Sequence, residues 1–337
     1  PARCNVLRRT GANTAGLIDD DTDRIIQLHH IRERSMADEP VRIYVGAHET
    51  EALAFKVLEH SIKRHTDRQV EMRTIDNSLA PPVTDPRFLP YTNFSYGRFG
   101  IPKLAGYQGR AVYMDSDMIV FRDIAELWDT PFDGAKVLVE KVTPGSEGKG
   151  RLTAVMLMNC EALDWDLEEI VNRLGVDYDM NGLMSVSPRV GEGELQDRLP
   201  LGWNSLDEVT EDTRLLHFTK IKTQPWVYPC HAYGHLWIDE IRMMLDDGSL
   251  TQDVIEEEVA SGHIRPSILP ELGLDDRYRG KTFTCKDLLR FDRRAGYVIH
   301  KKLLDWMEQR KQANLAVRER EDPEGFRRWR RKEMIQI

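Results

Sequence analysis

Residues 111–121 read AVYMDSDMIVF, two apolar runs that are separated only by Asp115, Ser116 and Asp117. Short apolar runs bounded by polar turn residues are typical of buried β-strands. Placing two carboxylates between such strands costs free energy unless they have a partner. We therefore expect this triplet to bind a ligand. The alternative is a tight turn in which the aspartates only cap the backbone that follows.

The sequence before this triplet alternates between strand-like and helix-like patterns. Residues 41–47 read VRIYVGA, a β-branched run that ends in small residues, as a buried strand does. Apolar residues then recur at helical spacing as far as Ile62, and a second strand is predicted at 69–75. A strand, a helix and a strand with short links predict an α/β domain with parallel strand pairing.

The pattern changes near Gly234, because only amphipathic helices are predicted beyond it. We therefore expect three regions: a polar N-terminal appendage at 1–40, a catalytic domain at 41–235, and a helical C-terminal extension at 236–337.

Composition narrows the class of protein. The chain has a net charge of −9, which argues against a nucleic-acid binder, because such proteins usually present a basic face. It has no apolar run long enough to span a bilayer. The four cysteines stand singly, so we expect reduced thiols and neither a disulfide scaffold nor a zinc site. Together these features favour a cytoplasmic enzyme.

The acidic triplet falls at the carboxyl end of a strand, where open α/β sheets bind their ligands. Two carboxylate oxygens suit Mg²⁺ or Mn²⁺, which would in turn hold a diphosphate. His217 ends another apolar run, and an imidazole that completes such a site favours Mn²⁺. Lys220 and Lys222 follow it and could grip phosphate oxygens, although each alone is more often a solvated charge.

These segments resemble glycosyltransferase family 8. The resemblance covers residues 41–235 and is carried by the strand at 41–47, Ser95–Arg98, residues 112–117, Glu126–Trp128, Trp203–Asn204 and His217–Trp226. It implies a GT-A type α/β fold, a Rossmann-like mixed sheet flanked by helices. It also implies transfer of a hexose from a nucleotide sugar, usually a UDP-sugar, with Mn²⁺ as cofactor and with retention of configuration.

The resemblance implies roles for individual residues. Asp115, Asp117 and His217 match the three metal ligands, and Ser116 lies between two of them in the donor site. Arg98 matches an arginine near the donor sugar. The loop Ala47, His48 and Glu49 falls where the family contacts the nucleobase.

The chain also departs from the family pattern, so we expect a divergent member. The segment from His217 to Trp226 has one extra residue and Gln224 before Pro225, which leaves the phosphate-binding lysine open between Lys220 and Lys222. Asp179 matches a family aspartate and is the predicted catalytic carboxylate. Arg98 is the other predicted catalytic residue. The glutamine expected next to Asp179 is Met180.

Two other functions remain as alternatives. A catalytically silent glycan-binding or scaffold protein with a GT-A fold would explain Met180, although such a protein has no need of a paired-carboxylate metal site. A sugar-nucleotide pyrophosphorylase would carry a glycine-rich, basic phosphate loop after its first strand. Residues 46–50 read GAHET, which is neither glycine-rich nor basic.

The basic stretch Phe326–Lys332 has two interpretations. It is either a solvated terminal helix or a peripheral membrane contact with Phe326 and Trp329 as shallow anchors. The second interpretation suits a lipid-linked acceptor. The expected partners are therefore a nucleotide-sugar donor and a carbohydrate or lipid-linked acceptor.

Overall fold

The computed structural model describes residues 39–75, 79–81, 83, 85, 88, 91, 93–140, 153–184, 193–299 and 301–335. The elements below belong to one unit, Val41–Ile337. The predicted appendage at 1–40 lies outside the described residues except for its last two positions.

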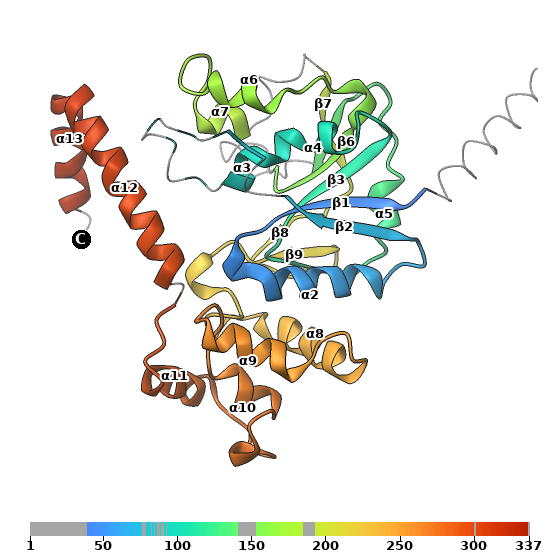
Figure 1. The fold of residues 1–337 in the computed structure, drawn as a ribbon, viewed down its shortest axis with the longest axis vertical. Coiled ribbons are helices and arrows are strands. Elements are labelled where there is room, and N and C mark those ends of the chain that lie inside the picture. Colours follow the sequence, from blue (N-terminus) through green and yellow to red (C-terminus); the bar gives the residue numbers. More distant parts are fainter. Residues whose placement is uncertain are drawn as a thin grey trace, which may run out of the picture. The chain divides into compact units, whose positions relative to one another are not determined.

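The larger sheet has six strands in the order β2-β1-β3-β6-β5-β7 (Figure 1). β1 pairs in parallel with β2 and β3, whereas β6 runs antiparallel to β3 and β5, so the sheet is mixed. The predicted α/β class is thereby confirmed. The strand bounds are β1 (Val41–Gly46), β2 (Val70–Thr74), β3 (Arg110–Asp115), β5 (Val137–Glu140), β6 (Val155–Asn159) and β7 (Leu195–Leu199).

A smaller sheet has the order β4-β9-β8, with β4 at Met118–Val120, β8 at Ser205–Leu206 and β9 at Leu215–His217. β4 and β9 are antiparallel, and Met118 lies opposite His217. β3 of the larger sheet ends at Asp115, and β4 of the smaller one begins three residues later at Met118. The chain thus passes from one sheet to the other through the acidic triplet.

Helices cover both faces of the larger sheet (Figure 1). Tyr44 and Tyr113 pack in one core cluster with residues of α4, α6 and α7. Their neighbours Ile43 and Val112 pack in another cluster with α2 and α5, because alternate side chains of a strand point to opposite faces. The helix bounds are α2 (Ala52–Lys63), α3 (Asn93–Gly97), α4 (Ile101–Leu104), α5 (Ala125–Trp128), α6 (Leu167–Asn172) and α7 (Met180–Met184).

The chain after Gly234 is helical: α8 (Gly234–Asp246), α9 (Gln252–Ala260), α10 (Ile268–Leu272), α11 (Cys285–Arg294), α12 (Lys301–Glu321) and α13 (Pro323–Ile335). A third core cluster joins Val57 of α2, Leu216 of β9 and Trp237 of α8. Buried Glu240 of α8 also accepts a hydrogen bond from Arg64 Nε at 2.8 Å. The boundary at 235 remains a prediction, and the helices after it share a core with the strands before it.

One prediction about the cysteines is wrong, because Cys230 and Cys285 form a disulfide. Their Cα atoms lie 5.4 Å apart, within the usual range for such a bond, although 55 residues separate them in sequence. Folding brings the segment after β9 against the first residue of α11, and the spacing of single cysteines along a chain carries no record of that contact. Cys160 is a buried free thiol, and burial raises its pKa to about 12.

Among the described helices, none has the length and apolar character needed to cross a bilayer. In α13 the ring of Phe326 is only 7% exposed, and the side chain of Trp329 lies outside the described part of the chain. Peripheral membrane contact through Phe326–Lys332 stays a prediction.

Candidate metal centre

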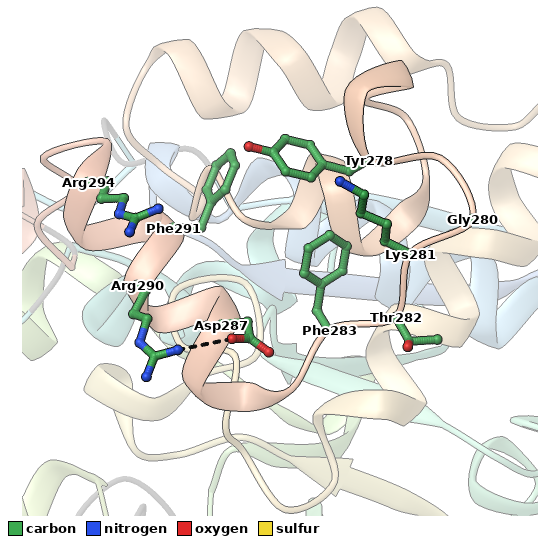
Figure 2. A pocket seen from close by; sticks show the side chains of 9 residues that line it. All are labelled: Tyr278, Gly280, Lys281, Thr282, Phe283, Asp287, Arg290, Phe291 and Arg294. Carbon is green, nitrogen blue, oxygen red and sulfur yellow. Dashed lines mark hydrogen bonds and ion pairs between the residues drawn. The ribbon is translucent and has the colours of Figure 1, made fainter.

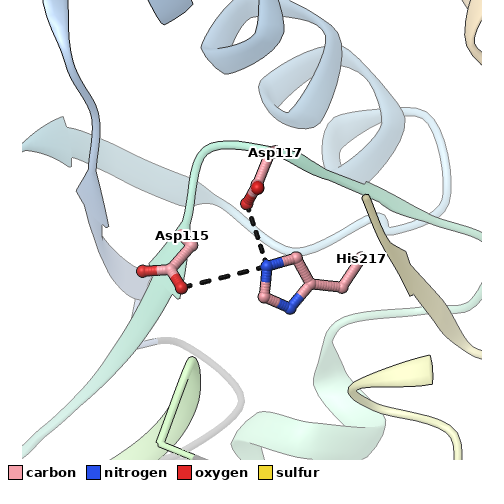
Figure 3. Close-up of side chains that lie close together, drawn as sticks. All are labelled: Asp115, Asp117 and His217. Carbon is pink, nitrogen blue, oxygen red and sulfur yellow. Dashed lines mark ion pairs between the residues drawn. The ribbon is translucent and has the colours of Figure 1, made fainter. Parts of the chain in front are cut away.

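Asp115, Asp117 and His217 come together between the two sheets, and one possible ligand atom from each lies within 4.8 Å of the other two. Both aspartates face the same ring nitrogen of His217 (Figure 3). His217 Nε2 lies 3.0 Å from Asp117 Oδ1 and 3.9 Å from Asp115 Oδ2. The structure therefore places the three predicted ligands in one group.

Strand pairing explains why these distant residues meet. Gly46 of β1 lies opposite Asp115 of β3, and Ser116 N donates to Gly46 O at 3.0 Å. On the other side, Phe218 N donates to Asp117 O at 2.9 Å as β9 pairs with β4. The ends of three strands are thus fixed around the triplet.

Asn204 orients the imidazole. His217 Nδ1 lies 2.9 Å from Asn204 Oδ1, an oxygen that can only accept, so Nδ1 carries a hydrogen and Nε2 is the ring nitrogen that faces the aspartates. An outer hydrogen bond of this kind fixes the tautomer and ring orientation of a metal-ligating histidine. The sequence indicated the Trp203–Asn204 pair through the family resemblance, but it did not predict the hydrogen bond between Asn204 and His217.

The electrostatics of the group fit a divalent cation. Burial raises the pKa of Asp115, although Arg98 and His217 oppose that shift. Burial lowers the pKa of His217, but the nearby charges of Asp117 and Asp115 outweigh it and the pKa is raised. The buried Oδ1 of Asp117 has His217 Nε2 as its near neighbour, at 3.0 Å. Two carboxylates and one imidazole form a ligand set that suits Mn²⁺ or Mg²⁺.

Arg98 lies beside this centre, and its role toward a donor sugar remains a prediction. Its guanidinium is buried, with Nη2 3.6 Å from Asp115 Oδ1 and Nη1 donating to Thr153 O at 2.8 Å. It also stacks over the ring of Tyr113 at 4.3 Å from the ring centroid. Tyr113 Oη in turn donates to Asp115 Oδ1. Arg98 and Tyr113 together hold one oxygen of Asp115.

A third carboxylate, that of Glu51, lies beside the triplet and was not predicted. Ser116 is buried and donates from Oγ to Glu51 Oε2 at 3.0 Å, and His48 N donates to the same oxygen at 2.8 Å. Burial, with the charge of Asp117 adding to it, raises the pKa of Glu51 to about 8. Glu51 follows β1 at the same sheet edge as Asp115, and this shared edge is the signal that could have found it.

The loop Ala47, His48 and Glu49 follows β1 beside the centre, because Gly46 lies opposite Asp115. His48 caps the short 3₁₀ turn Glu49–Glu51, with Nδ1 accepting from Thr50 N at 3.3 Å. The side chain of Glu49 is exposed. The loop thus lies next to the metal centre, and its contact with a nucleobase remains a prediction.

The lysines after His217 lie on the surface, and Gln224 occupies the position beside the metal centre. Lys220 is 71% exposed with Nζ 3.8 Å from Asp207 Oδ2, and Lys222 is exposed in the 3₁₀ turn Ile221–Thr223. Gln224 is only 1% exposed, and its Nε2 donates to Asp117 Oδ2 at 2.9 Å and to Phe218 O at 3.0 Å. The sequence showed Gln224 only as a departure from a pattern.

Asp179 is exposed at the start of α7, where its Oδ1 accepts from Gly182 N at 2.7 Å. In the described structure this carboxylate serves as a helix cap and does not belong to the group formed by Asp115, Asp117 and His217. Its catalytic role remains a prediction.

Comparisons with known proteins agree with the sequence motifs. The family model "Glycosyl transferase family 8" matches residues 61–152, a segment that contains Arg98, Asp115 and Asp117. Protein CDI of Arabidopsis thaliana is 36% identical over 99 residues, which is 28% of this chain and 38% of that protein. The chain therefore spans well under half the length of this curated relative.

Solved glycosyltransferases overlap with part of the chain. The galactosyltransferase LgtC, solved with donor and acceptor sugar analogues, has 15% identity and a TM-score of 0.45 over 63% of this chain and 97% of its own. The bifunctional WbbM has 15% identity and a TM-score of 0.42 over 60% of this chain and 50% of its own. Mouse xyloside xylosyltransferase 1 has 12% identity and a TM-score of 0.41 over 54% and 98%.

TM-scores of this size describe a partial overlap, so we base the functional conclusion on the family match and on the site of this chain. The mixed sheet flanked by helices agrees with the GT-A type of fold that the resemblance implied. Residues 61–152 of this chain match the model of glycosyltransferase family 8.

Proposed function

We propose that this chain is a metal-dependent glycosyltransferase that moves a hexose from a nucleotide sugar to a hydroxyl group. The donor is a UDP-sugar, the acceptor is a glycan or a lipid-linked glycan, and the configuration is retained. The observation that carries the proposal is the partly buried group of Asp115, Asp117 and His217, in which both carboxylates face one imidazole nitrogen, Nε2. The family match over 61–152 supports it.

Asp115, Asp117 and His217 would hold Mn²⁺ or Mg²⁺. When bound, such an ion supplies positive charge against the charge that develops on a departing diphosphate. The protein prepares this site in advance. Asn204 turns His217 Nε2 toward the aspartates, Gln224 holds Asp117 Oδ2, and Tyr113 holds Asp115 Oδ1. Fixed ligands of this kind need little rearrangement during the reaction.

Arg98 would orient the donor sugar. Its Nη1 and Nη2 are engaged with Thr153 O and Asp115, whereas its Nε is buried and has no hydrogen-bond partner. An unpaired buried donor costs free energy, and a sugar hydroxyl or phosphate oxygen that reached Nε would remove this cost. The stack on Tyr113 keeps the guanidinium plane fixed for such a contact.

Residues 47–49 would contact the nucleobase, and Lys220 or Lys222 would grip phosphate oxygens. Retention would proceed by attack from the same face, with the leaving phosphate oxygen taking the proton of the acceptor, or through a covalent intermediate on a carboxylate. Asp179 is the candidate for that carboxylate. Removal of Asp179 distinguishes the two routes, because only the second requires it.

Calorimetry of UDP binding tests the proposal. The wild-type chain should bind UDP in the presence of Mn²⁺ and lose most of this affinity when a chelator is added. Asp117→Asn should bind UDP weakly with or without Mn²⁺, whereas Asp164→Asn, a change at an exposed aspartate of the same protein, should behave as wild type. Equal and chelator-insensitive UDP affinity in all three proteins would refute the metal-dependent function.

The donor can be identified from melting temperatures, because a ligand that binds only the native state raises them. The UDP-sugar that gives the largest rise with Mn²⁺ is then tested for turnover. A silent glycan-binding protein would bind without releasing UDP. A pyrophosphorylase would instead consume pyrophosphate with the nucleotide sugar.

A further inference from the structure

A second candidate site lies in the helical C-terminal part, where α11 and the loop before it border a cavity of about 630 Å³ (Figure 2). This volume is typical of small-molecule sites. None of its lining residues belongs to the metal centre, so the two sites are separate. The lining residues are Tyr278, Gly280, Lys281, Thr282, Phe283, Asp287, Arg290, Phe291 and Arg294.

Three aromatic rings form the apolar wall of this cavity. The ring of Tyr278 lies 5.8 Å from that of Phe283 and 5.8 Å from that of Phe291, both in edge-to-face geometry. All three side chains are partly exposed. Such rings offer a flat apolar surface to the C–H face of a bound sugar ring while their edges support one another.

The cavity is positively charged, although the whole chain has a net charge of −9. Lys281, Arg290 and Arg294 are exposed and line it with a single carboxylate, Asp287. Among the described residues, neither Lys281 nor Arg294 forms an ion pair. Figure 2 shows the two arginines on one side of the rings and Lys281 on the other.

Asp287 is already engaged, so it does not cancel this charge for a ligand. Its Oδ2 accepts from Thr284 N at 3.1 Å and from Thr284 Oγ1 at 2.6 Å, which caps α11. Its Oδ1 accepts from Arg290 Nη1 at 3.2 Å. The hydrogen bond from Thr284 lowers the pKa of Asp287, so the carboxylate stays ionised and holds Arg290 at the wall.

The helix that carries Phe291, Arg290 and Arg294 is anchored near both of its ends. Cys285, its first residue, is bonded to Cys230, and Asp292 accepts from Ser267 N at 2.7 Å and from Ser267 Oγ at 2.8 Å. A site on an anchored helix loses less conformational entropy when a ligand binds than a site on a mobile loop.

We propose that this cavity binds an anionic sugar, one that carries a phosphate or a carboxylate group. The sugar ring rests on Tyr278, Phe283 and Phe291, and the anion pairs with Arg294 and Lys281. Arginine is suited to this role because its planar guanidinium donates two parallel hydrogen bonds to a phosphate or carboxylate. The site would hold a charged unit of the acceptor away from the reacting hydroxyl, and this role rests on the proposed transferase function.

Ligand-detected NMR and calorimetry on the full chain test the binding, without metal ion or nucleotide sugar. The probes are glucose 6-phosphate, glucuronate, glucose and inorganic phosphate. The affinity for at least one of the two anionic sugars should be about tenfold higher, or more, than the affinity for glucose and the affinity for inorganic phosphate. The phosphate and carboxylate arms show which anion is preferred.

Arg294→Gln and Lys281→Gln should each weaken binding of that sugar about tenfold, the range expected for one charge-assisted hydrogen bond. Lys286→Gln and Arg293→Gln remove exposed cations of the same helix that do not line the cavity, and they should leave the affinity unchanged. Phe283→Leu should remove the advantage of the sugar over inorganic phosphate.

Equal affinity for glucose and the anionic sugars would overturn the proposal, as would equal weakening by all four cation variants. Asp117→Asn should bind the anionic sugar normally. This variant separates the two proposals. Loss of transfer with intact sugar binding in Asp117→Asn would concern the metal centre alone. Absence of anionic-sugar binding in the wild-type chain would refute the second site and leave the transferase proposal standing.

Discussion

Gln224 donates a hydrogen bond from Nε2 to Asp117 Oδ2 at 2.9 Å, although 107 residues separate the two in sequence. The amide also donates to Phe218 O, so its orientation is fixed. A neutral amide at this position holds one oxygen of Asp117 without neutralising the carboxylate. The other oxygen, Oδ1, is left facing His217 at 3.0 Å.

Gln224→Leu should weaken Mn²⁺ binding, because Asp117 loses the donor that fixes its orientation. A hydrogen bond to a charged group contributes roughly 1.5–3 kcal/mol, so a loss of about tenfold or more in Mn²⁺ affinity is expected. Titration of free Mn²⁺ by electron paramagnetic resonance measures it. Lys222→Ala, two residues away and exposed, is the matched control and should bind Mn²⁺ as wild type does. Unchanged Mn²⁺ affinity in Gln224→Leu would show that Asp117 needs no support from Gln224.

Asn204→Ala should free the imidazole of His217 to rotate. Removal of a partner that orients a metal ligand typically costs 10- to 100-fold in metal affinity, and a loss on the order of 10-fold is expected here. Because the imidazole is the ligand that favours Mn²⁺, the preference for Mn²⁺ over Mg²⁺ should fall as well. Competition between the two ions measures both effects. A uniform loss of affinity for both ions would contradict the assigned role of His217 and favour a general structural effect.

The Cys230–Cys285 disulfide should stabilise the native fold by about 2–4 kcal/mol, because it closes a long loop in the unfolded chain. Urea unfolding of the oxidised wild type and of the double variant Cys230→Ser, Cys285→Ser measures this free energy. The native oxidised protein should show no reaction of Cys160 with a thiol reagent, since that thiol is buried and its pKa is raised to about 12. Peptide mapping that found Cys230 and Cys285 as free thiols in the air-oxidised protein would contradict the bond.

Asp292 should make stability depend on pH in a defined direction. Burial raises its pKa in the folded chain, so the native state binds a proton more tightly than the unfolded state does. The free energy of unfolding contributed by this group is therefore fully present below the ordinary pKa of about 4 and falls as pH rises through the raised value. Asp292→Asn removes the titration, so the stability of the wild type should decline relative to this variant across that window. A difference that stays constant with pH, or that changes in the opposite direction, would contradict the shift.

Much of the fold could be predicted because the relevant signals are local. The apolar runs at 41–47, 111–114 and 118–121 correspond to β1, β3 and β4. Runs this short and this apolar, bounded by polar turn residues, are typical of buried strands. Asp115 and Asp117 stood out for the same reason, as charges between buried strands. His217 was found because it ends an apolar run, and strand ends gather at one sheet edge.

The contacts that sequence reasoning missed depend on how distant segments pack. Gln224 reaches Asp117 only because β9 pairs with β4, and Cys230 reaches Cys285 only because α11 packs against the segment after β9. Glu51 meets Ser116 because β1 and β3 end together. No periodicity in the chain records these pairings. A family motif, and not local chemistry, singled out Arg98.

The central claim is that His217 and the two aspartates bind one divalent ion together. Pulsed electron paramagnetic resonance of bound Mn²⁺ tests it, because this method detects a histidine nitrogen that coordinates the ion. The wild-type chain should show one such nitrogen coupling, and His217→Gln should lose it while retaining its fold by circular dichroism. Bound Mn²⁺ without a nitrogen coupling in the wild type, or the same coupling in His217→Gln, would contradict the account.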